Sequence, residues 1–210
     1  PRNESSAASD VYKRQLIIIE NLKRYGFKNF IISLHYLPDK IKDFLGSGDD
    51  YGINIKYVIE KEPLGTAGCL SLIQDSLSGN NLVVNADVLT DIDYRGLLDF
   101  HTKKNSAITV CTREYIHEIP FGVVNVSNGM IKSIEEKPSI KSWVNAGIYV
   151  INFDQLPILK KDKYLDMPDL LESTLAEGEK VSNFEISNYW IDIGQIHDYE
   201  KAQLDINNNL

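Results

Sequence analysis

The chain has 210 residues, of which 43% are hydrophobic and 25% charged, with a formal net charge of -8 at pH 7. This length and composition are typical of a globular chain that buries one sizeable core. The acidic balance argues against a nucleic-acid or anionic-membrane partner, because phosphate surfaces attract a clustered basic face.

The first segment, residues 1–15, is polar and has no hydrophobic periodicity. Its composition predicts a disordered tail. A second interpretation is a non-native origin, because Ser5–Gln15 can be back-translated into DNA that resembles a transposon adapter of sequencing libraries. Either way, we expect the folded domain to cover residues 16–210.

Helices and strands alternate through the first half of the chain. Helical spacing of apolar residues predicts helices at Leu16–Tyr25, Asp39–Leu45, Ala67–Leu77 and Tyr94–Lys103. Apolar or alternating runs predict strands at Phe30–Ile32, Ile53–Ile59, Leu82–Val84 and Ala107–Cys111. This alternation predicts an α/β fold with a doubly wound, mostly parallel, Rossmann-like sheet.

The second half departs from this rhythm. Strands are predicted at Phe121–Val126, Met130–Glu135 and Val144–Ile151, with short turns between them. We expect them to form a small antiparallel insertion packed on the main sheet. A helix at Asp169–Ala176, a strand at Val181–Ile186, an aromatic segment and a final helix complete the chain.

An acidic stretch follows the predicted strand Leu82–Val84. Asp87 lies just past the end of this strand, where ligands of open α/β sheets collect and where a carboxylate can hold a divalent cation on phosphate oxygens. The alternative is that Asn85, Asp87, Asp91 and Asp93 are turn and cap residues. For Asp93, directly before a predicted helix, the cap is the better interpretation.

A glycine-containing turn at Pro63–Gly68 precedes a predicted helix. Gly65 and Gly68 allow the backbone to approach a flat ligand, and amides at the helix start could bind a base or an anion. The turn could equally be a plain connection. Likewise, 135–138 could be a solvated strand end, and Trp190 and Asp192 a core and a turn residue.

Six stretches together resemble the sugar-1-phosphate nucleotidyltransferases. In family order they are PLGTAG (Pro63–Gly68), VNADVLTDID (Val84–Asp93), FGVV (Phe121–Val124), IEEKP (Ile134–Pro138), NAGIYV (Asn145–Val150) and WIDIG (Trp190–Gly194). The resemblance runs from about Leu16 to Ile206. It implies an enzyme that joins a nucleoside triphosphate to a sugar 1-phosphate and releases pyrophosphate.

The resemblance also implies roles for individual residues. Asp87 and Asp192 would hold Mg²⁺ on the phosphates, and Lys137 would bind the sugar phosphate. These three would be the catalytic residues. The substrate-binding residues would be Gly65, Thr66, Ala67 and Gly68 facing the base, Glu136 on the sugar hydroxyls, and Gly122, Asn145 and Gly147 in the sugar pocket.

One family feature is not found in this sequence. Family members begin with a strand, a glycine-rich loop of the form GGxGTRLxPLT and a PKP segment. Without these groups, which grip the triphosphate, we expect the 210-residue chain to be nearly inactive. We also expect a gap in the sheet with an exposed strand edge.

Three functional hypotheses remain open at this stage. The first is a truncated nucleotidyltransferase that uses GTP, since PLGTAG looks most like the mannose-1-phosphate guanylyltransferase branch. The second is a non-catalytic, regulatory paralogue that binds nucleotide sugars. The third is a metal-dependent glycosyltransferase, because Asp91-Ile92-Asp93 forms a D-x-D motif.

The cysteines, the histidines and the lengths of the apolar runs indicate the compartment and the partners of the protein. Cys69 and Cys111 lack metal or redox spacing, which indicates free thiols in a reducing cytoplasm. The histidines show no spacing typical of a metal cluster or a triad. No apolar run approaches the roughly 20 residues of a membrane span, so we expect no membrane partner, whereas an oligomer is left open.

Overall fold

The computed structural model describes residues 15–187 and 189–192. A helix over residues 15–24 comes first. It is followed by β1 (Asn29–Leu34), α2 (Pro38–Leu45), β2 (Asn54–Ile59), α3 (Gly65–Gly68), β3 (Asn80–Val84), β4 (Val88–Thr90), α4 (Tyr94–Lys104), β5 (Ile108–Glu118), β6 (Gly122–Ser127), β7 (Met130–Glu136), β8 (Ser139–Asn152), α5 (Met167–Ala176), β9 (Val181–Glu185) and β10 (Trp190–Asp192). Residues 1–14 of the predicted tail and the final helix lie outside the described residues, whereas Gln15 begins the first helix.

The strands form one mixed sheet and three two-stranded pairs. The four-stranded sheet has the order β3-β8-β5-β9, in which β8 runs antiparallel to both neighbours and β5 pairs in parallel with β9. β1 and β2 pair in parallel, while β4 with β10 and β6 with β7 pair antiparallel. The α/β class is confirmed, with β8 as an antiparallel strand inside the sheet.

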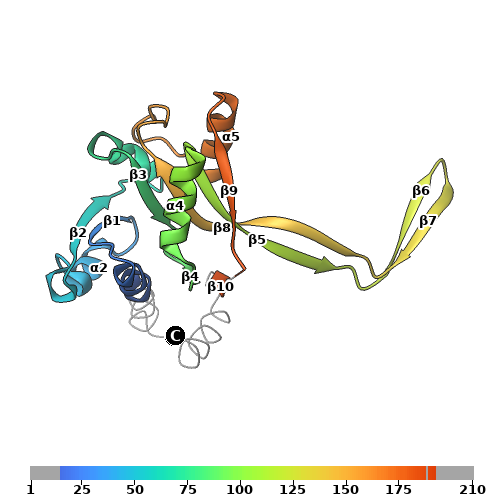
Figure 1. Ribbon diagram of the computed structural model, residues 1–210, viewed down its shortest axis with the longest axis horizontal. Coiled ribbons are helices and arrows are strands. Elements are labelled where there is room, and N and C mark those ends of the chain that lie inside the picture. Colours follow the sequence, from blue (N-terminus) through green and yellow to red (C-terminus); the bar gives the residue numbers. More distant parts are fainter. Residues whose placement is uncertain (1–14, 188, 193–210) are drawn as a thin grey trace.

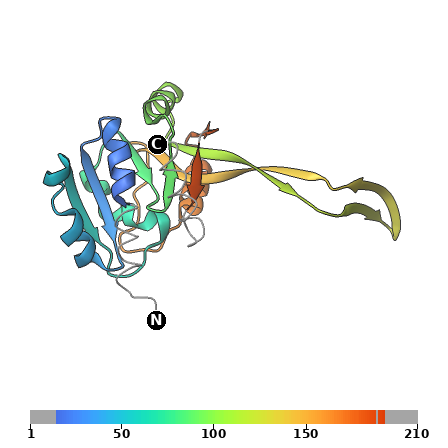
Figure 2. The ribbon, with the colours of Figure 1, turned by 90° about the horizontal axis from the view of Figure 1, so that it is seen from below.

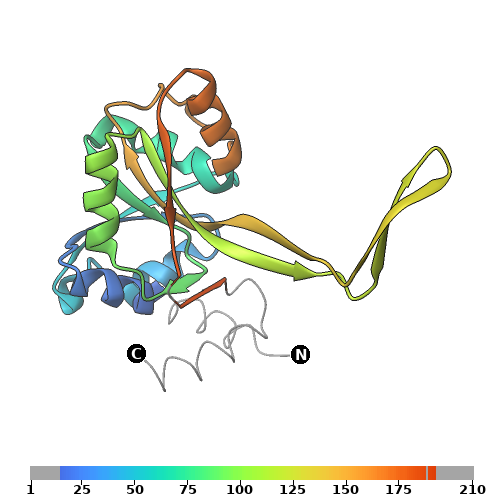
Figure 3. The ribbon, with the colours of Figure 1, turned by 45° about the vertical axis from the view of Figure 1, so that its right-hand side comes forward.

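Residues 146–151 of the central strand β8 are buried on both faces. Ile148 and Val150 pack in a cluster with Leu97 of α4, whereas Ile151, on the other side of the pleat, packs with Leu170 of α5. Successive side chains of a strand point to opposite faces, so the continuous apolar run at 146–151 suits a strand covered on both sides. Figure 3 shows α4 and α5 on opposite sides of the sheet.

Local capping agrees with the sequence at several helix ends. The Asp93 side chain accepts a hydrogen bond of 3.1 Å from the Arg95 amide at the start of α4, so the predicted cap is confirmed. Pro38 and Pro168 lie in the first turns of α2 and α5. Gly26, with φ of 93°, ends the helix over residues 15–24.

The predicted helix at Ala67–Leu77 is wrong. The chain instead forms the four-residue α3, followed by 3-10 turns at Cys69–Leu72 and Gln74–Ser76. The Ser71 hydroxyl donates to the Gly68 carbonyl at 2.7 Å, and the Gln74 amide makes two 3.0 Å hydrogen bonds with the backbone of Leu159. These side-chain bonds compete with a regular helical ladder.

The antiparallel insertion forms a long arm. β5 and β8 stay paired from Thr112–Asn145 out to Glu118–Ser139, and the β6–β7 hairpin follows at the far end. Figures 1 and 2 show this arm extending away from the body of the molecule. The expectation that the insertion packs on the main sheet is therefore wrong, because the continuous β5–β8 ladder carries the hairpin away from it.

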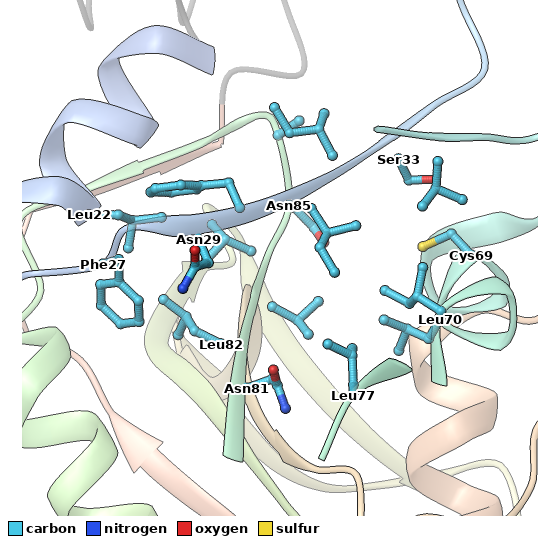
Figure 4. Close-up of a pocket in the computed structure, with 18 of the residues that line it drawn as sticks. Leu22, Phe27, Asn29, Ser33, Cys69, Leu70, Leu77, Asn81, Leu82 and Asn85 are labelled. Carbon is cyan, nitrogen blue, oxygen red and sulfur yellow. The ribbon is translucent and has the colours of Figure 1, made fainter. Parts of the chain in front are cut away.

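An opening separates β1 from β3. Each of these strands is paired on one edge only within the described residues, β1 with β2 and β3 with β8. A cavity of about 520 Å³ lies between them. Figure 4 shows residues that line it, including Asn29 and Ser33 of β1 and Asn81 and Leu82 of β3. This opening agrees with the gap in the sheet expected from the sequence.

Candidate active site

The strand pair β4–β10 joins two distant parts of the acidic sequence pattern. Trp190 is opposite Thr90, and Asp192 is opposite Val88. The Thr90 hydroxyl donates to the Tyr189 carbonyl at 2.7 Å, which adds a side-chain bond to this short ladder. As a result, Asp192 lies beside the residue that follows Asp87, although 104 positions separate Asp192 from Val88 in the chain.

Trp190 anchors this strand pair to the central sheet. Its Nε1 donates to the Ala146 carbonyl of β8 at 2.9 Å. The Arg113 guanidinium lies 6.0 Å from the centroid of the Trp190 ring and donates to the Trp190 carbonyl. A half-buried tryptophan with a satisfied N–H and a cation over its ring fixes the approach of β10 to β8.

Gly147 allows the end of β3 to approach β8 closely. Its φ is 72°, and its carbonyl accepts a 2.9 Å hydrogen bond from the Asn85 amide, while its own amide donates to Asn145 Oδ1 at 3.0 Å. A Cβ at this position would lie 2.9 Å from both Asn85 Nδ2 and Val88 Cγ2. Glycine is therefore required by conformation and by space.

A pocket of about 220 Å³ opens at this junction. Four of the residues expected at the site lie in its wall, namely Thr66, Asn145, Gly147 and Asp192. The other lining residues are Asn85, Val88, Ala146, Tyr149, Met167, Pro168 and Trp190. The fold thus brings together residues from α3, β4, β8, α5 and β10 and from the loop between β3 and β4.

The charge of Asp87 acts on Tyr149, a residue in the wall of this pocket. Burial raises the pKa of the Tyr149 hydroxyl, a hydrogen bond with the Asn145 side chain lowers it, and the negative charge of Asp87 adds to the rise. Tyr149 is almost fully buried and lines the pocket. Tyr149 and Asn85 are site residues that sequence reasoning left without a role, although Asn85 belongs to the Asn-Ala-Asp triplet.

The PLGTAG loop packs on the segment before α5. The Ala67 and Gly68 amides donate to the Leu165 carbonyl at 2.9 and 3.0 Å, and the Thr66 amide donates to Asp166 Oδ1 at 3.1 Å. A Cβ at Gly65 would lie 2.7 Å from the Leu165 carbonyl oxygen. These amides, which the sequence suggested for a base or an anion, bind protein atoms in this conformation.

Hydrogen bonds from Tyr164 and from that loop lower the pKa of the Asp166 carboxyl. The Tyr164 hydroxyl donates at 2.7 Å, and the Thr66 amide is the donor from the loop. The Thr66 hydroxyl in turn donates to Asp166 and accepts from the Met167 amide at 2.7 Å. Thr66 therefore links the loop to the first turn of α5 at the edge of the pocket.

Three expected site residues lie on the arm instead. Gly122 pairs with Glu136 between β6 and β7, and Lys137, with φ of 48°, follows where the chain bends into β8. Counted from Ser139 to Asn145, β8 extends roughly 20 Å at the ordinary rise of a strand. The sugar-binding residues expected at Gly122, Glu136 and Lys137 are thus separated from the pocket in this conformation.

The D-x-D motif has a structural explanation. The Asp93 carboxylate caps α4, and Ile92 is 1% exposed in the core. Within the described residues, no group of three or more His, Cys, Asp or Glu side chains is arranged to hold a metal ion. Asp93 of this motif therefore has a structural role as the cap of α4.

The fold is shared with solved structures. HddC from Yersinia pseudotuberculosis superposes with a TM-score of 0.69 at 24% sequence identity, over 91% of this chain and 84% of that one. This likeness shows that the two chains share an α/β fold.

The chain belongs to the nucleotidyl transferase family, whose model matches residues 10–209. It is 30% identical over 197 residues to a mannose-1-phosphate guanyltransferase of Yarrowia lipolytica and 31% identical over 195 residues to one of Pichia angusta. Each alignment covers 86% of this chain and 52% of the relative. The chain therefore spans about half the length of these curated relatives.

Proposed function

We propose that the protein transfers a guanylyl group from GTP to mannose 1-phosphate, which gives GDP-mannose and pyrophosphate. The pairing of β10 with β4 supports this most, because it holds Asp192, which lines the pocket, next to Val88, the residue that follows Asp87 in the chain. Family membership supports the reaction class. The names of the guanyltransferase relatives support the choice of nucleotide and sugar.

The donor set fits a magnesium ion. Mg²⁺ prefers oxygen ligands, keeps several waters, and in phosphate-handling sites uses only one or two carboxylates besides the substrate. Asp87 and Asp192 would hold it, and a three-residue cluster is not needed. Bound there, the ion would neutralise phosphate charge and polarise the α-phosphate.

The reaction needs a nucleophile, an electrophile and a leaving group. An oxygen of the sugar phosphate forms a bond to the α-phosphorus of GTP, and the bond from that phosphorus to the bridging oxygen breaks, so pyrophosphate leaves with its electron pair. Lys137 would bind the sugar phosphate as a point charge, and Glu136 would accept hydrogen bonds from sugar hydroxyls. Asn145 and Gly147, with Gly122, would line the sugar pocket.

The proposed role of Lys137 requires movement of the arm. Asn145 is at the pocket, whereas Lys137 is at the bend between β7 and β8. The arm would have to bend toward the pocket to bring Lys137 and Glu136 to the substrate. The nucleotide would meanwhile contact the face of the PLGTAG loop formed by Gly65, Thr66, Ala67 and Gly68.

Two assays test the proposal. In the first, the 210-residue chain is titrated with GDP-mannose with and without Mg²⁺, and we expect metal-dependent binding that UDP-glucose and dTDP-glucose do not reproduce. In the second, pyrophosphate release is measured for the chain alone and for the chain preceded by a family strand and GGxGTRL loop. We expect turnover only from the extended chain. Equal turnover by the chain alone would contradict the predicted inactivity, and binding without turnover in both would favour a regulatory paralogue.

A further inference from the structure

The β6–β7 hairpin at the end of the arm is amphipathic. Residues that lie directly opposite each other in an antiparallel pair place their side chains on the same face. The register of this pair puts four aliphatic side chains on one face, which we call the aliphatic face: Val124 opposite Ile134, and Val126 opposite Ile131. The other face contains Asn125, whose side chain donates a 2.9 Å hydrogen bond to Ser133 opposite to it. Only one side of the hairpin is therefore strongly apolar.

The aliphatic face is open in this conformation. Its four side chains are between 43% and 66% exposed. Four such side chains expose on the order of 400 Å² of apolar surface, a size of patch that often marks an interaction site. An isolated two-stranded hairpin is also only marginally stable in water, and packing on its apolar face stabilises it. Covering the aliphatic face would therefore stabilise the hairpin itself.

The arm holds this face away from the rest of its own chain. The β5–β8 ladder from Thr112–Asn145 to Glu118–Ser139 precedes the hairpin and extends roughly 20 Å at the ordinary rise of a strand. Figures 1 and 2 show the hairpin beyond the end of this ladder, separated from the body of the molecule. The face is thus presented to a partner rather than to the body.

The charge distribution favours a second copy as that partner. The segment 119–138 contains two lysines and two glutamates, Lys132, Lys137, Glu135 and Glu136, so its net charge is zero, whereas the whole chain carries -8. A strongly charged partner would find no complement on such a segment, but two neutral hairpins meet without repulsion. The ladder separates the acidic bodies by more than two Debye lengths of about 8 Å at physiological salt, so their repulsion is screened.

We propose that the aliphatic face is a docking surface for the same face of a second copy of this chain. The two hairpins would pack face to face about a two-fold axis, which makes a self-complementary interface from one patch. Because the interface is small, the association is weak and depends on protein concentration. The inference does not depend on the reaction proposed above, since it rests on the hairpin alone and its test contains no nucleotide or sugar.

Two neighbouring residues provide a matched pair of variants. Ile131 lies on the aliphatic face and is 61% exposed, whereas Met130, opposite Ser127, lies on the other face and is 64% exposed. Both Ile131→Lys and Met130→Lys add one positive charge at a mainly exposed position, so both should fold. Sedimentation equilibrium of the 210-residue chain over a range of concentrations measures the dissociation constant of the dimer.

We expect a concentration-dependent dimer for the wild type and for Met130→Lys, with similar dissociation constants. Ile131→Lys should raise the dissociation constant roughly tenfold or more, because a two-fold interface contains each substitution twice and buries both charges. A monomer at all concentrations up to the solubility limit would overturn the proposal. So would a dimer that both variants retain equally or lose equally.

Amide hydrogen exchange at low and high protein concentration locates the contact. We expect exchange in 122–127 and 130–136 to slow as the concentration rises, because pairing stabilises the hairpin. Exchange in 29–34 and 80–84, the strands with an unpaired edge, should not change. Slowing confined to those two strands would mean association through strand edges. Hairpin protection that is independent of concentration would mean that the hairpin packs on its own chain, and either result would overturn the proposal.

Discussion

Asp192 is paired with Val88 across the β10–β4 ladder, and Val88 directly follows Asp87 in the chain. The sequence distance between the two acidic residues is therefore bridged by a three-residue strand pair. Trp190 secures that pair through its 2.9 Å hydrogen bond to the Ala146 carbonyl. Mutations that remove the charge of Asp87 or Asp192 should affect catalysis more than folding. Mutations that remove the packing of Trp190 or Val88 should affect folding more than catalysis.

Asp87→Asn and Asp192→Asn should each reduce turnover of the extended chain on the order of 100-fold, because each removes a charge proposed to hold the metal. The amides are close in size to the carboxylates, so stability should change little. Pyrophosphate release at saturating GTP is the measurement. Asp99→Asn on the exposed face of α4 is the control and should leave turnover as it is. Full activity in either site variant would contradict the proposed metal roles.

Lys137→Ala in the extended chain should raise the KM for mannose 1-phosphate more than the KM for GTP, because the ammonium is proposed to bind the sugar phosphate. Lys132→Ala, on exposed β7 of the same arm, is the matched control. Initial rates at varied concentrations of each substrate separate the two constants. If both variants behave alike, the arm does not deliver Lys137 to the substrate.

Gly147→Ala should lower the free energy of unfolding by about 3 kcal/mol, from an unfavourable positive φ and from overpacking against Asn85 and Val88. Gly178→Ala has a similar φ of 83° and no atom within 4 Å of the added Cβ. It should lose only about 1 kcal/mol. Urea unfolding of both variants measures the difference in their free energies of unfolding. Equal losses of stability would contradict the expected overpacking at Gly147.

His101 should make stability depend on pH. It is 1% exposed, its Nδ1 lies 2.7 Å from Thr109 Oγ1 and its Nε2 3.2 Å from Asn80 Oδ1, and burial lowers its pKa from the ordinary 6.5. The unfolded chain therefore binds more protons between the two pKa values. Stability is complete above about pH 6.5 and is lost as the pH falls toward the folded-state pKa.

Urea unfolding between pH 7.5 and 5 checks this for the wild type and for His101→Gln. The glutamine keeps hydrogen-bonding groups at the site but does not titrate. We expect the wild type to lose more stability than the variant over this range. Parallel curves would mean that His101 does not control the acid sensitivity.

Local sequence signals predicted several elements correctly. The Asp93 cap, the prolines that begin α2 and α5, and Gly26 act within one helical turn, so neighbouring residues contain the information. The apolar run of β8 likewise reports burial on both faces. Motif order along the chain was enough to indicate the nucleotidyl transferase family.

Contacts between distant segments altered other expectations. The helix after Gly68 is broken because Gln74 bonds the Leu159 backbone, and the PLGTAG amides bond Leu165 and Asp166. The direction of the β6–β7 arm follows from the long β5–β8 ladder. The hydrophobic periodicity of a short stretch of sequence does not predict such contacts, because they depend on which distant segments meet in space.

By itself, the sequence determined the α/β class, the caps and buried strands, and the acidic residues worth testing, because these follow from the pattern of neighbouring side chains. Only the tertiary structure decided that Asp192 lines a pocket beside Val88, the residue after Asp87, while Lys137 lies on the arm. The physical reason is that strand pairing and packing select among many distant partners, and the free energy of those choices comes from the whole fold.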